Sequence, residues 1–185
     1  NESLFVVVAG KPSTSSGAAM IILRERMKFS ADPKIIFRDP IHILAFGFGA
    51  GLSPRAPGTM GTLIAVPLIM FIGSFGWIAH AIFAAIICVS GVYICGISAT
   101  KLGVHDHPGI VWDEIAGFAV GMLTVPLTFK SLLVGFVLFR CFDIFKPWPI
   151  READHSLKGG LGIMLDDVIA GVFTGVVLYA LNSWL

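Results

Sequence analysis

The sequence predicts an all-α fold: a polytopic membrane bundle of about five helices, with its polar site on the cytoplasmic face. Hydrophobic residues make up 56% of the 185 residues and charged residues only 14%, whereas a soluble domain has about 25% charged residues. The mean hydropathy is +0.86. A hydrophobic soluble bundle of helices is the alternative. The net charge of +1 gives no basic signal, so no nucleic-acid partner is expected.

The chain is expected to divide into a flexible N-terminal extension, residues 1–26, and a single membrane domain, residues 27–185. The extension begins with the apolar run "NESLFVVVAG", which no basic residue precedes, so a cleaved signal peptide is not expected. The following "KPSTSSGAA" has the composition of a flexible linker. The length of the remainder suits one domain.

Five apolar segments are predicted to form the helices of the bundle. Trp77–Ser98 is a clean apolar stretch of spanning length, for which about 20 residues are needed. The other four are shorter or carry polar residues at one end: Thr59–Gly73, Ile110–Leu127, Ser131–Phe145 and Met164–Leu185. The glycine-rich segment Ile41–Leu52 is expected to be interfacial or re-entrant.

Basic residues are distributed unequally between the two sides of this bundle. From residue 28 onward, the side on which the first segment begins holds Lys28, Lys34, Arg38, Arg55, Lys101, Lys146, Arg151 and Lys158. The opposite side holds Lys130, and Arg140 lies within the fourth segment. By the positive-inside rule the first side is cytoplasmic. The polar motifs of the chain all fall on this same side.

Two apolar segments begin with a pair of acidic residues. "GIVWDEIAG" contains Asp113 and Glu114, and "GIMLDDVIAG" contains Asp166 and Asp167. A single aspartate at a helix N-terminus often only caps the helix. Four carboxylates together with Asp143 would repel one another strongly at one end of a small bundle, unless a cation lies among them. Oxygen ligands favour a hard cation, so Mg²⁺ is expected first, then Mn²⁺ or Ca²⁺.

The pattern D-x-x-A-G-x-x-x-G occurs twice, from Asp113 to Gly121 and from Asp167 to Gly175. In each copy the aspartate and both glycines lie on one helix face. Glycines at this spacing let membrane helices pack closely, so these faces are also candidates for homo-oligomer contacts. The repeat makes Asp113 and Asp167 the strongest candidates to face each other across one metal ion. Asp166 and Glu114 are then further ligands or plain caps.

Basic residues accompany the acidic ones. Arg140 lies in the apolar run "VLFRCFDIF", where a charge is costly and usually functional. It is three residues before Asp143, so an ion pair within the helix is one interpretation. Lys146 follows at the end of the same segment. An arginine and a lysine beside a carboxylate-bound divalent cation are suited to hold a phosphate group.

Two further motifs are candidates for the same site. "SPRAPGTMGT" places Ser53, Arg55 and Thr59 before and within the start of a helix, where backbone N–H groups can bind a phosphate. A plain turn with an N-cap is the alternative. "HDHP" contains His105, a candidate general acid or base, for which a solvated loop is the alternative.

With these residues in view, the chain resembles the bacterial phosphatidylglycerophosphatase A family. The resemblance covers about residues 40–183 and rests on "GFGAGLSPRAPGTMGT", "GVHDHPGIVWDE", "FRCFDIFKPWPIR" and "GGLGIMLDDVIAG" in this order. It implies a multi-pass enzyme of the bacterial cytoplasmic membrane, with membrane lipids around it. That enzyme would use Mg²⁺ to remove the terminal phosphate of phosphatidylglycerophosphate, giving phosphatidylglycerol.

The residues and the resemblance together give one mechanistic hypothesis. Mg²⁺ is held by some of Asp113, Glu114, Asp143, Asp166 and Asp167. Arg140 and Lys146 stabilise the charge that develops on the phosphate. Attack by water and attack by an aspartate remain alternatives. Two rival classes are an ion-coupled transporter, which predicts polar residues through the membrane midplane, and a lipid phosphotransferase, whose dense D-G-x-x-A-R pattern is absent.

Overall fold

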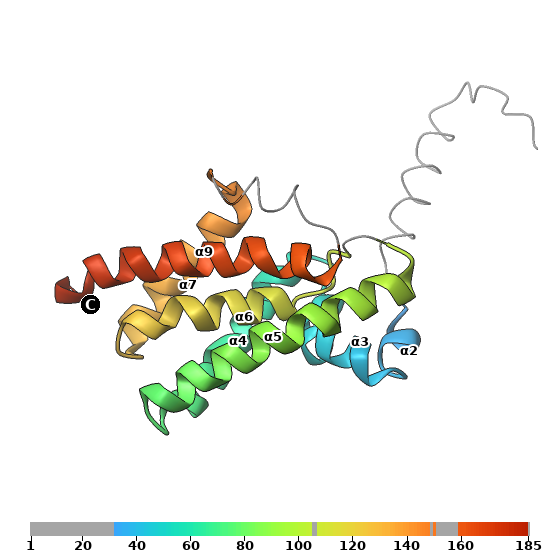
Figure 1. Cartoon of the computed structure of the whole chain (residues 1–185), viewed down its shortest axis with the longest axis horizontal. Helices are drawn as coiled ribbons and strands as arrows, with labels where there is room; N and C mark the ends of the chain where they lie inside the picture. The colour runs from blue at the N-terminus through green and yellow to red at the C-terminus, as the bar shows by residue number, and fades with distance from the viewer. Residues whose placement is uncertain (1–31, 105–106, 149, 151–158, 185) are drawn as a thin grey trace, which may run out of the picture. The chain divides into compact units, whose positions relative to one another are not determined.

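The computed structural model describes residues 32–104, 107–148, 150 and 159–184 (Figure 1). These residues lie within one compact unit, Ala31–Leu185. The expected N-terminal extension, residues 1–26, lies outside the described residues, as does His105. All regular secondary structure in the described ranges is helical, which confirms the all-α part of the predicted fold class.

Each of the five predicted segments overlaps one α-helix. These are α4 (Pro57–Gly73), α5 (Trp77–Leu102), α6 (Trp112–Gly121), α7 (Phe129–Phe145) and α9 (Gly160–Ala180). Shorter elements accompany them: α2 (Pro33–Ile36), α3 (Pro40–Ala45) and the 3₁₀ segments η1 (Gly47–Leu52), η2 (Met122–Thr124) and η3 (Asn182–Trp184). The segment expected to be interfacial or re-entrant is therefore divided between α3 and η1.

Several predicted boundaries differ from those in the structure, and two of these differences have a clear local cause. α6 ends at Gly121 instead of Leu127, because Val125 precedes Pro126 and adopts an extended conformation with φ −138° and ψ 157°. α9 begins at Gly160 instead of Met164, after Gly159 with φ 75°. Asp166 and Asp167 therefore lie about two turns inside α9, since an α-helix has about 3.6 residues per turn. They do not cap that helix.

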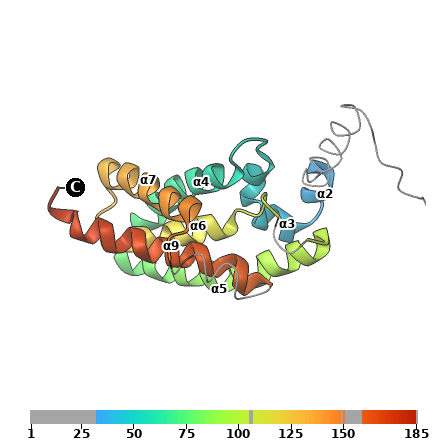
Figure 2. The same cartoon turned by 90° about the horizontal axis from the view of Figure 1, so that it is seen from above.

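The short helix α6 lies at the centre of the bundle. It packs against α9, α5, α4 and α7, and Figures 1 and 2 show the longer helices around it. None of its ten residues is exposed. Ten residues make a helix about 15 Å long, which is too short to cross a membrane. α6 is thus an internal helix that carries Asp113 and Glu114 into the interior of the protein.

α6 and α9 run in parallel and touch along their glycines. A Cβ atom on Gly171 would lie 2.1 Å from the carbonyl oxygen of Gly117, and one on Gly175 would lie 3.2 Å from that of Gly121. The two copies of the repeated pattern therefore face each other at equivalent positions, which brings their acidic ends to the same end of the helix pair. These glycine faces, proposed above as homo-oligomer contacts, are occupied within the chain.

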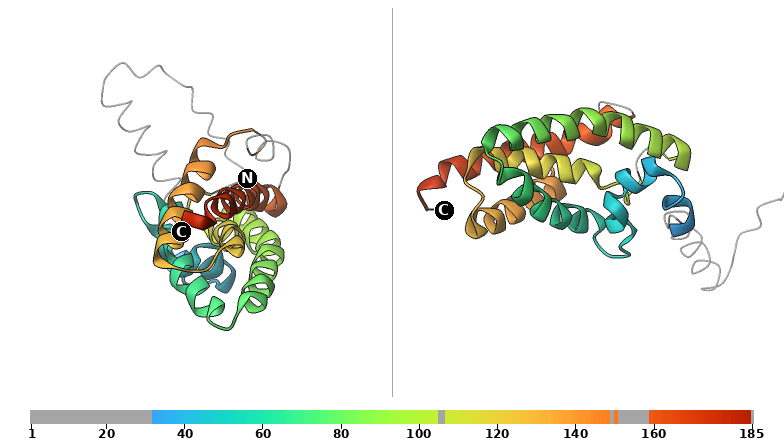
Figure 3. Two further views of the ribbon diagram at one scale, coloured as in Figure 1. Left: turned by 90° about the vertical axis from the view of Figure 1, so that its left-hand side faces the viewer. Right: turned by 90° about the horizontal axis from the view of Figure 1, so that it is seen from below.

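The outer surface of the bundle is apolar. On α5, Ile82, Ile86, Val89, Tyr93 and Ile97 lie along one face, each at least 41% exposed. α5 and α9 are both long and apolar enough to cross a membrane, with mean hydropathies of 2.2 and 1.9 over their most apolar windows. α4 is apolar but shorter. Large exposed apolar surfaces of this kind indicate association with a membrane, and Figure 3 shows the helices that carry them.

Candidate metal and phosphate site

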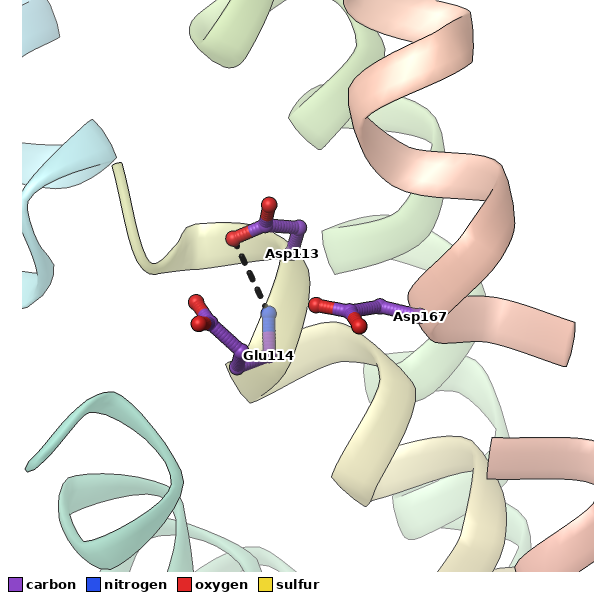
Figure 4. A group of neighbouring side chains, drawn as sticks. All are labelled: Asp113, Glu114 and Asp167. Carbon is purple, nitrogen blue, oxygen red and sulfur yellow. Dashed lines mark hydrogen bonds between the residues drawn. The ribbon is translucent and has the colours of Figure 1, made fainter. Parts of the chain in front are cut away.

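Three carboxylates meet where α6 and α9 pack together. Asp113 and Glu114 come from the first turn of α6, and Asp167 reaches toward them from α9 (Figure 4). One oxygen from each residue lies within 4.8 Å of the others. The backbone N–H of Glu114 donates to Oδ1 of Asp113 at 3.0 Å. Asp113 and Asp167 are 8% and 3% exposed, so the cluster is buried.

Two oxygens of this cluster, one on Glu114 and one on Asp167, have no hydrogen-bond donor among the described residues. Oε2 of Glu114 and Oδ1 of Asp167 are buried and accept no hydrogen bond from the described residues. Burial raises the pKa of Glu114 to about 8, and the negative charge of Asp167 acts in the same direction. Buried carboxylates without donors are costly unless a positive charge compensates them.

The spacing of the three oxygens is compatible with a hard divalent cation. Opposite ligands of Mg²⁺ are about 4.2 Å apart and those of Ca²⁺ about 5 Å apart. The three oxygens lie within 4.8 Å of one another, which is within the span of two opposite ligands of Ca²⁺. The cluster of Asp113, Glu114 and Asp167 thus has the chemistry and spacing of a metal site.

The remaining two carboxylates predicted as metal ligands lie against basic side chains. Asp143 Oδ2 is 2.6 Å from a terminal nitrogen of Arg140, and that nitrogen is 3.7 Å from Oε1 of Glu114. Asp166 Oδ2 accepts a hydrogen bond from Lys146 Nζ at 2.6 Å. Asp143 and Asp166 are still close enough to Asp167 to interact with its charge. The structure therefore gathers all five carboxylates but divides them into a cluster of three and two ion pairs.

Local backbone conformation positions the lysine. α7 ends at Phe145, and the capping residue Lys146 adopts the left-handed conformation with φ 41° and ψ 60° before Pro147. That conformation is uncommon for a residue with a side chain, and it is found most often at functional sites. It turns the chain at the end of α7, and Lys146 Nζ meets Asp166 on α9.

The start of α4 forms another wall of the site. A Cβ atom on Gly58 would lie 1.9 Å from Oε1 of Glu114 and 3.1 Å from a terminal nitrogen of Arg140. Gly58 was not among the residues predicted from the sequence. A glycine directly after the proline that starts a helix was the available signal, since it indicates a close approach.

The other residues predicted for the phosphate site lie around this turn. α4 has no side-chain N-cap, because the capping position is Ala56 with φ 48°. Its first-turn N–H groups are therefore free of a side-chain partner at that position, and Thr59 is half-buried among them. The hydroxyl of Ser53 donates to the carbonyl of Arg55 at 2.8 Å, and Arg55 is exposed.

The histidine motif is described in part. His107 is buried, accepts a hydrogen bond from the N–H of Gly109 at its Nδ1 at 3.0 Å, and stacks at a tilt on Phe46. It thereby orders the turn that leads into α6. The predicted role of His105 as an acid or base falls outside the described residues.

The described part of the protein is helical and has an apolar surface. It carries buried carboxylates at metal-ligand spacing, with an arginine and a lysine next to them. These are the features of a membrane-associated enzyme that acts on phosphate groups. Comparison with known proteins specifies the family. Residues 43–182 match the sequence model of the family described as Phosphatidylglycerophosphatase A, and the chain belongs to this family.

Individual relatives cover most of the chain. It is 43% identical over 156 residues to Phosphatidylglycerophosphatase A of Escherichia coli (strain K12), which covers 83% of this chain and 90% of that protein. The protein of the same name from Haemophilus influenzae is 42% identical over 154 residues, covering 82% and 94%. A relative from Bacteroides thetaiotaomicron, provisionally named phosphatidylinositol-3-phosphatase, is 33% identical over 151 residues, covering 77% and 92%. No solved structure matches the chain significantly.

Proposed function

We propose that this protein is a Mg²⁺-dependent phosphatidylglycerophosphatase, which removes the terminal phosphate of phosphatidylglycerophosphate to give phosphatidylglycerol. The observation that carries the proposal is the buried cluster of Asp113, Glu114 and Asp167 beside Arg140, in a chain 43% identical to a relative of that name. The reaction breaks one P–O bond of a phosphate monoester. Water supplies the hydroxyl of the released phosphate, and the glycerol oxygen takes up a proton.

Asp113, Glu114 and Asp167 would hold the Mg²⁺. When bound, such an ion polarises phosphoryl oxygens and favours formation of a nucleophilic hydroxide. The charge around the site supports a bound cation, because carboxylates outnumber basic side chains by five to two. A doubly charged phosphate would be repelled from this cluster without compensation.

Arg140 and Lys146 would bind the phosphate. Nε of Arg140 is buried and donates no hydrogen bond to any described residue, so it is a donor that a phosphate oxygen could accept from. The uncapped N-terminus of α4, next to Arg140, adds backbone donors and the positive end of a helix dipole. Asp143 and Asp166 would orient Arg140 and Lys146 through their ion pairs.

We further propose that the protein is a multi-pass protein of the bacterial cytoplasmic membrane. The indole N–H of Trp112 donates to the carbonyl of Ile87, which sets the acidic cluster beside the middle of α5. From that level α5 continues for about 15 Å toward Trp77 and about 22 Å toward Leu102. Lys101, near the second end, pairs with Asp39. The end of α5 that carries Lys101, toward which the acidic start of α6 points, would therefore face the cytoplasm.

One assay tests the proposed function. Purified protein in detergent is given phosphatidylglycerophosphate, and phosphate release is measured with and without Mg²⁺. We expect release only with Mg²⁺, and none from the Asp167→Asn variant. Asp39→Asn is the matched control, because Asp39 pairs with Lys101 away from the cluster. Turnover at the wild-type rate in Asp167→Asn would contradict the assignment. Phosphatidylinositol 3-phosphate in the same assay tests the headgroup preference, since one relative carries that name.

A further inference from the structure

The described residues form a hollow at the end of α6 opposite the acidic cluster. It has a volume of about 650 Å³, a size typical of small-molecule pockets. The end of α4, the start of α5 and the segment Met122–Leu127 form its walls. These elements meet at the lower left of Figure 1, away from the start of α6.

The polar groups on these walls already have partners within the protein. The indole N–H of Trp77 donates to the carbonyl of Leu123 at 2.9 Å, and the His80 ring is 3.0 Å from the carbonyl oxygen of Ala119. The Thr124 hydroxyl donates to the carbonyl of Gly175 at 2.9 Å. A polar ligand would find few free donors or acceptors there. The pocket is therefore suited to an apolar occupant.

Side chains at the rim give the pocket access to the apolar outer surface. Met70 and Trp77 line the pocket and are 49% and 66% exposed. Phe71 and Phe75, beside them in the chain, are 63% and 69% exposed. Exposed apolar surface of this kind is suited to contact with lipid hydrocarbon, so the molecules that reach the pocket first are acyl chains.

The depth of the pocket matches the length of a lipid tail. Met122, a pocket residue directly after α6, lies nine residues beyond Asp113, which corresponds to about 14 Å along the helix axis. One leaflet of a bilayer contributes about 15 Å of hydrocarbon, half of the total core. A lipid whose phosphate lies at the acidic cluster would have its tail ends at the level of the pocket.

We propose that this pocket binds the terminal part of one acyl chain of the lipid substrate, and so makes turnover depend on chain length. The proposal rests on the proposed function. It adds a second recognition element to the phosphate site: the carboxylates and basic residues select the headgroup, and the pocket selects the tail. Substrates whose tails are too short to reach the pocket would bind through the headgroup alone.

Pocket-filling variants test the proposal. Met70→Trp and Leu123→Trp place bulk into the pocket from two different walls. Phe71→Trp is the matched control, because it is adjacent on α4 and exposed. Dipalmitoyl and dioctanoyl phosphatidylglycerophosphate are compared at equal mole fractions in the same detergent micelles. Wild-type phosphate release establishes the enzyme activity independently of the pocket.

We expect the wild type and Phe71→Trp to prefer the long-chain substrate. Both pocket-filling variants should lose about tenfold of that preference in kcat/KM, the factor that corresponds to two buried methylene groups. Their activity on the short-chain substrate should be unchanged, which also shows that they fold. An unchanged preference would overturn the proposal, because the pocket would then hold another lipid or none. Equal loss on both substrates would also overturn it.

Discussion

Replacement of Gly58 by alanine tests whether the position of Glu114 controls turnover. The new methyl group would lie 1.9 Å from Oε1 of Glu114, whereas ordinary contacts begin at 3.4 Å. The carboxylate would therefore have to move by about 1.5 Å. A misplacement of about 1 Å at a reacting centre costs on the order of 100-fold in rate, or about 2.7 kcal/mol of activation free energy.

The same substitution should leave the fold intact. Glu114 Oε1 is at the end of a flexible side chain, which can rotate away. Alanine is also favoured over glycine in a helix by about 1 kcal/mol. We therefore expect a melting temperature close to that of the wild type together with about 100-fold slower phosphate release, and a higher Mg²⁺ concentration for half-maximal activity.

A matched control is available on α7. A Cβ atom on Gly135 would lie 2.6 Å from the sulfur of Met122, so Gly135→Ala introduces similar crowding against a flexible side chain far from the carboxylates. That variant should retain activity on the short-chain substrate. If Gly58→Ala turned over at the wild-type rate with the wild-type Mg²⁺ requirement, the position of Glu114 would not matter, and the reasoning would be wrong.

Three further predictions address the basic residues, the helix contact and pH. Lys146→Ala should raise KM for the lipid about tenfold or more, because a charge-assisted hydrogen bond contributes about 1.5–3 kcal/mol. Lys146→Arg should recover part of the lost affinity. Equal KM values for wild type and Lys146→Ala would exclude a role in phosphate binding. Gly171→Ala should lower the free energy of unfolding by about 1–3 kcal/mol, since its Cβ would lie 2.1 Å from the Gly117 carbonyl oxygen; an unchanged denaturation midpoint would contradict the backbone contact. Burial lowers the pKa of His42, whose Nδ1 lies 2.8 Å from the Ser98 hydroxyl. The native protein therefore favours the neutral ring, so the His42 contribution to stability is complete above a pH of about 6.5 and decreases as the pH falls below it. Thermal melting should show a shallower pH dependence in His42→Gln, and an identical slope would refute this.

The helices were predictable because they follow from apolar runs, and the errors have local causes. The composition of Gly160–Gly162 is typical of a loop, but these residues form the first turn of α9. The reason is a close contact of Gly160, where a Cβ atom would lie 1.8 Å from the Val92 carbonyl oxygen. Only glycine permits that contact. The early end of α6 follows from Pro126, a signal that was present in the sequence.

The acidic and basic residues of the site were also predictable, but their partition was not. In the repeated pattern, Asp113 and Asp167 each precede two glycines on the same helix face at the same spacing. The structure places both aspartates in one cluster. Which neighbours meet Asp143 and Asp166 depends on the rotation of α7 and α9 about their axes. Successive residues of an α-helix point about 100° apart around its axis. The spacing of residues in the sequence does not determine how each helix is rotated against its neighbours. Gly58 was missed for the same reason, since it belongs to the site through packing and carries no functional group.

The central claim is that Asp113, Glu114 and Asp167 together bind one divalent cation, and Mn²⁺ binding measures this directly. Electron paramagnetic resonance of the purified protein, titrated with Mn²⁺, reports the number of bound ions and their affinity. We expect one tightly bound ion per wild-type chain, which Mg²⁺ displaces. Asp39→Asn should bind Mn²⁺ as tightly as the wild type. Asp167→Asn should bind it at least tenfold more weakly, since loss of metal-site partners typically costs about 10–100-fold in affinity. Equal affinity in wild type and Asp167→Asn would contradict the account.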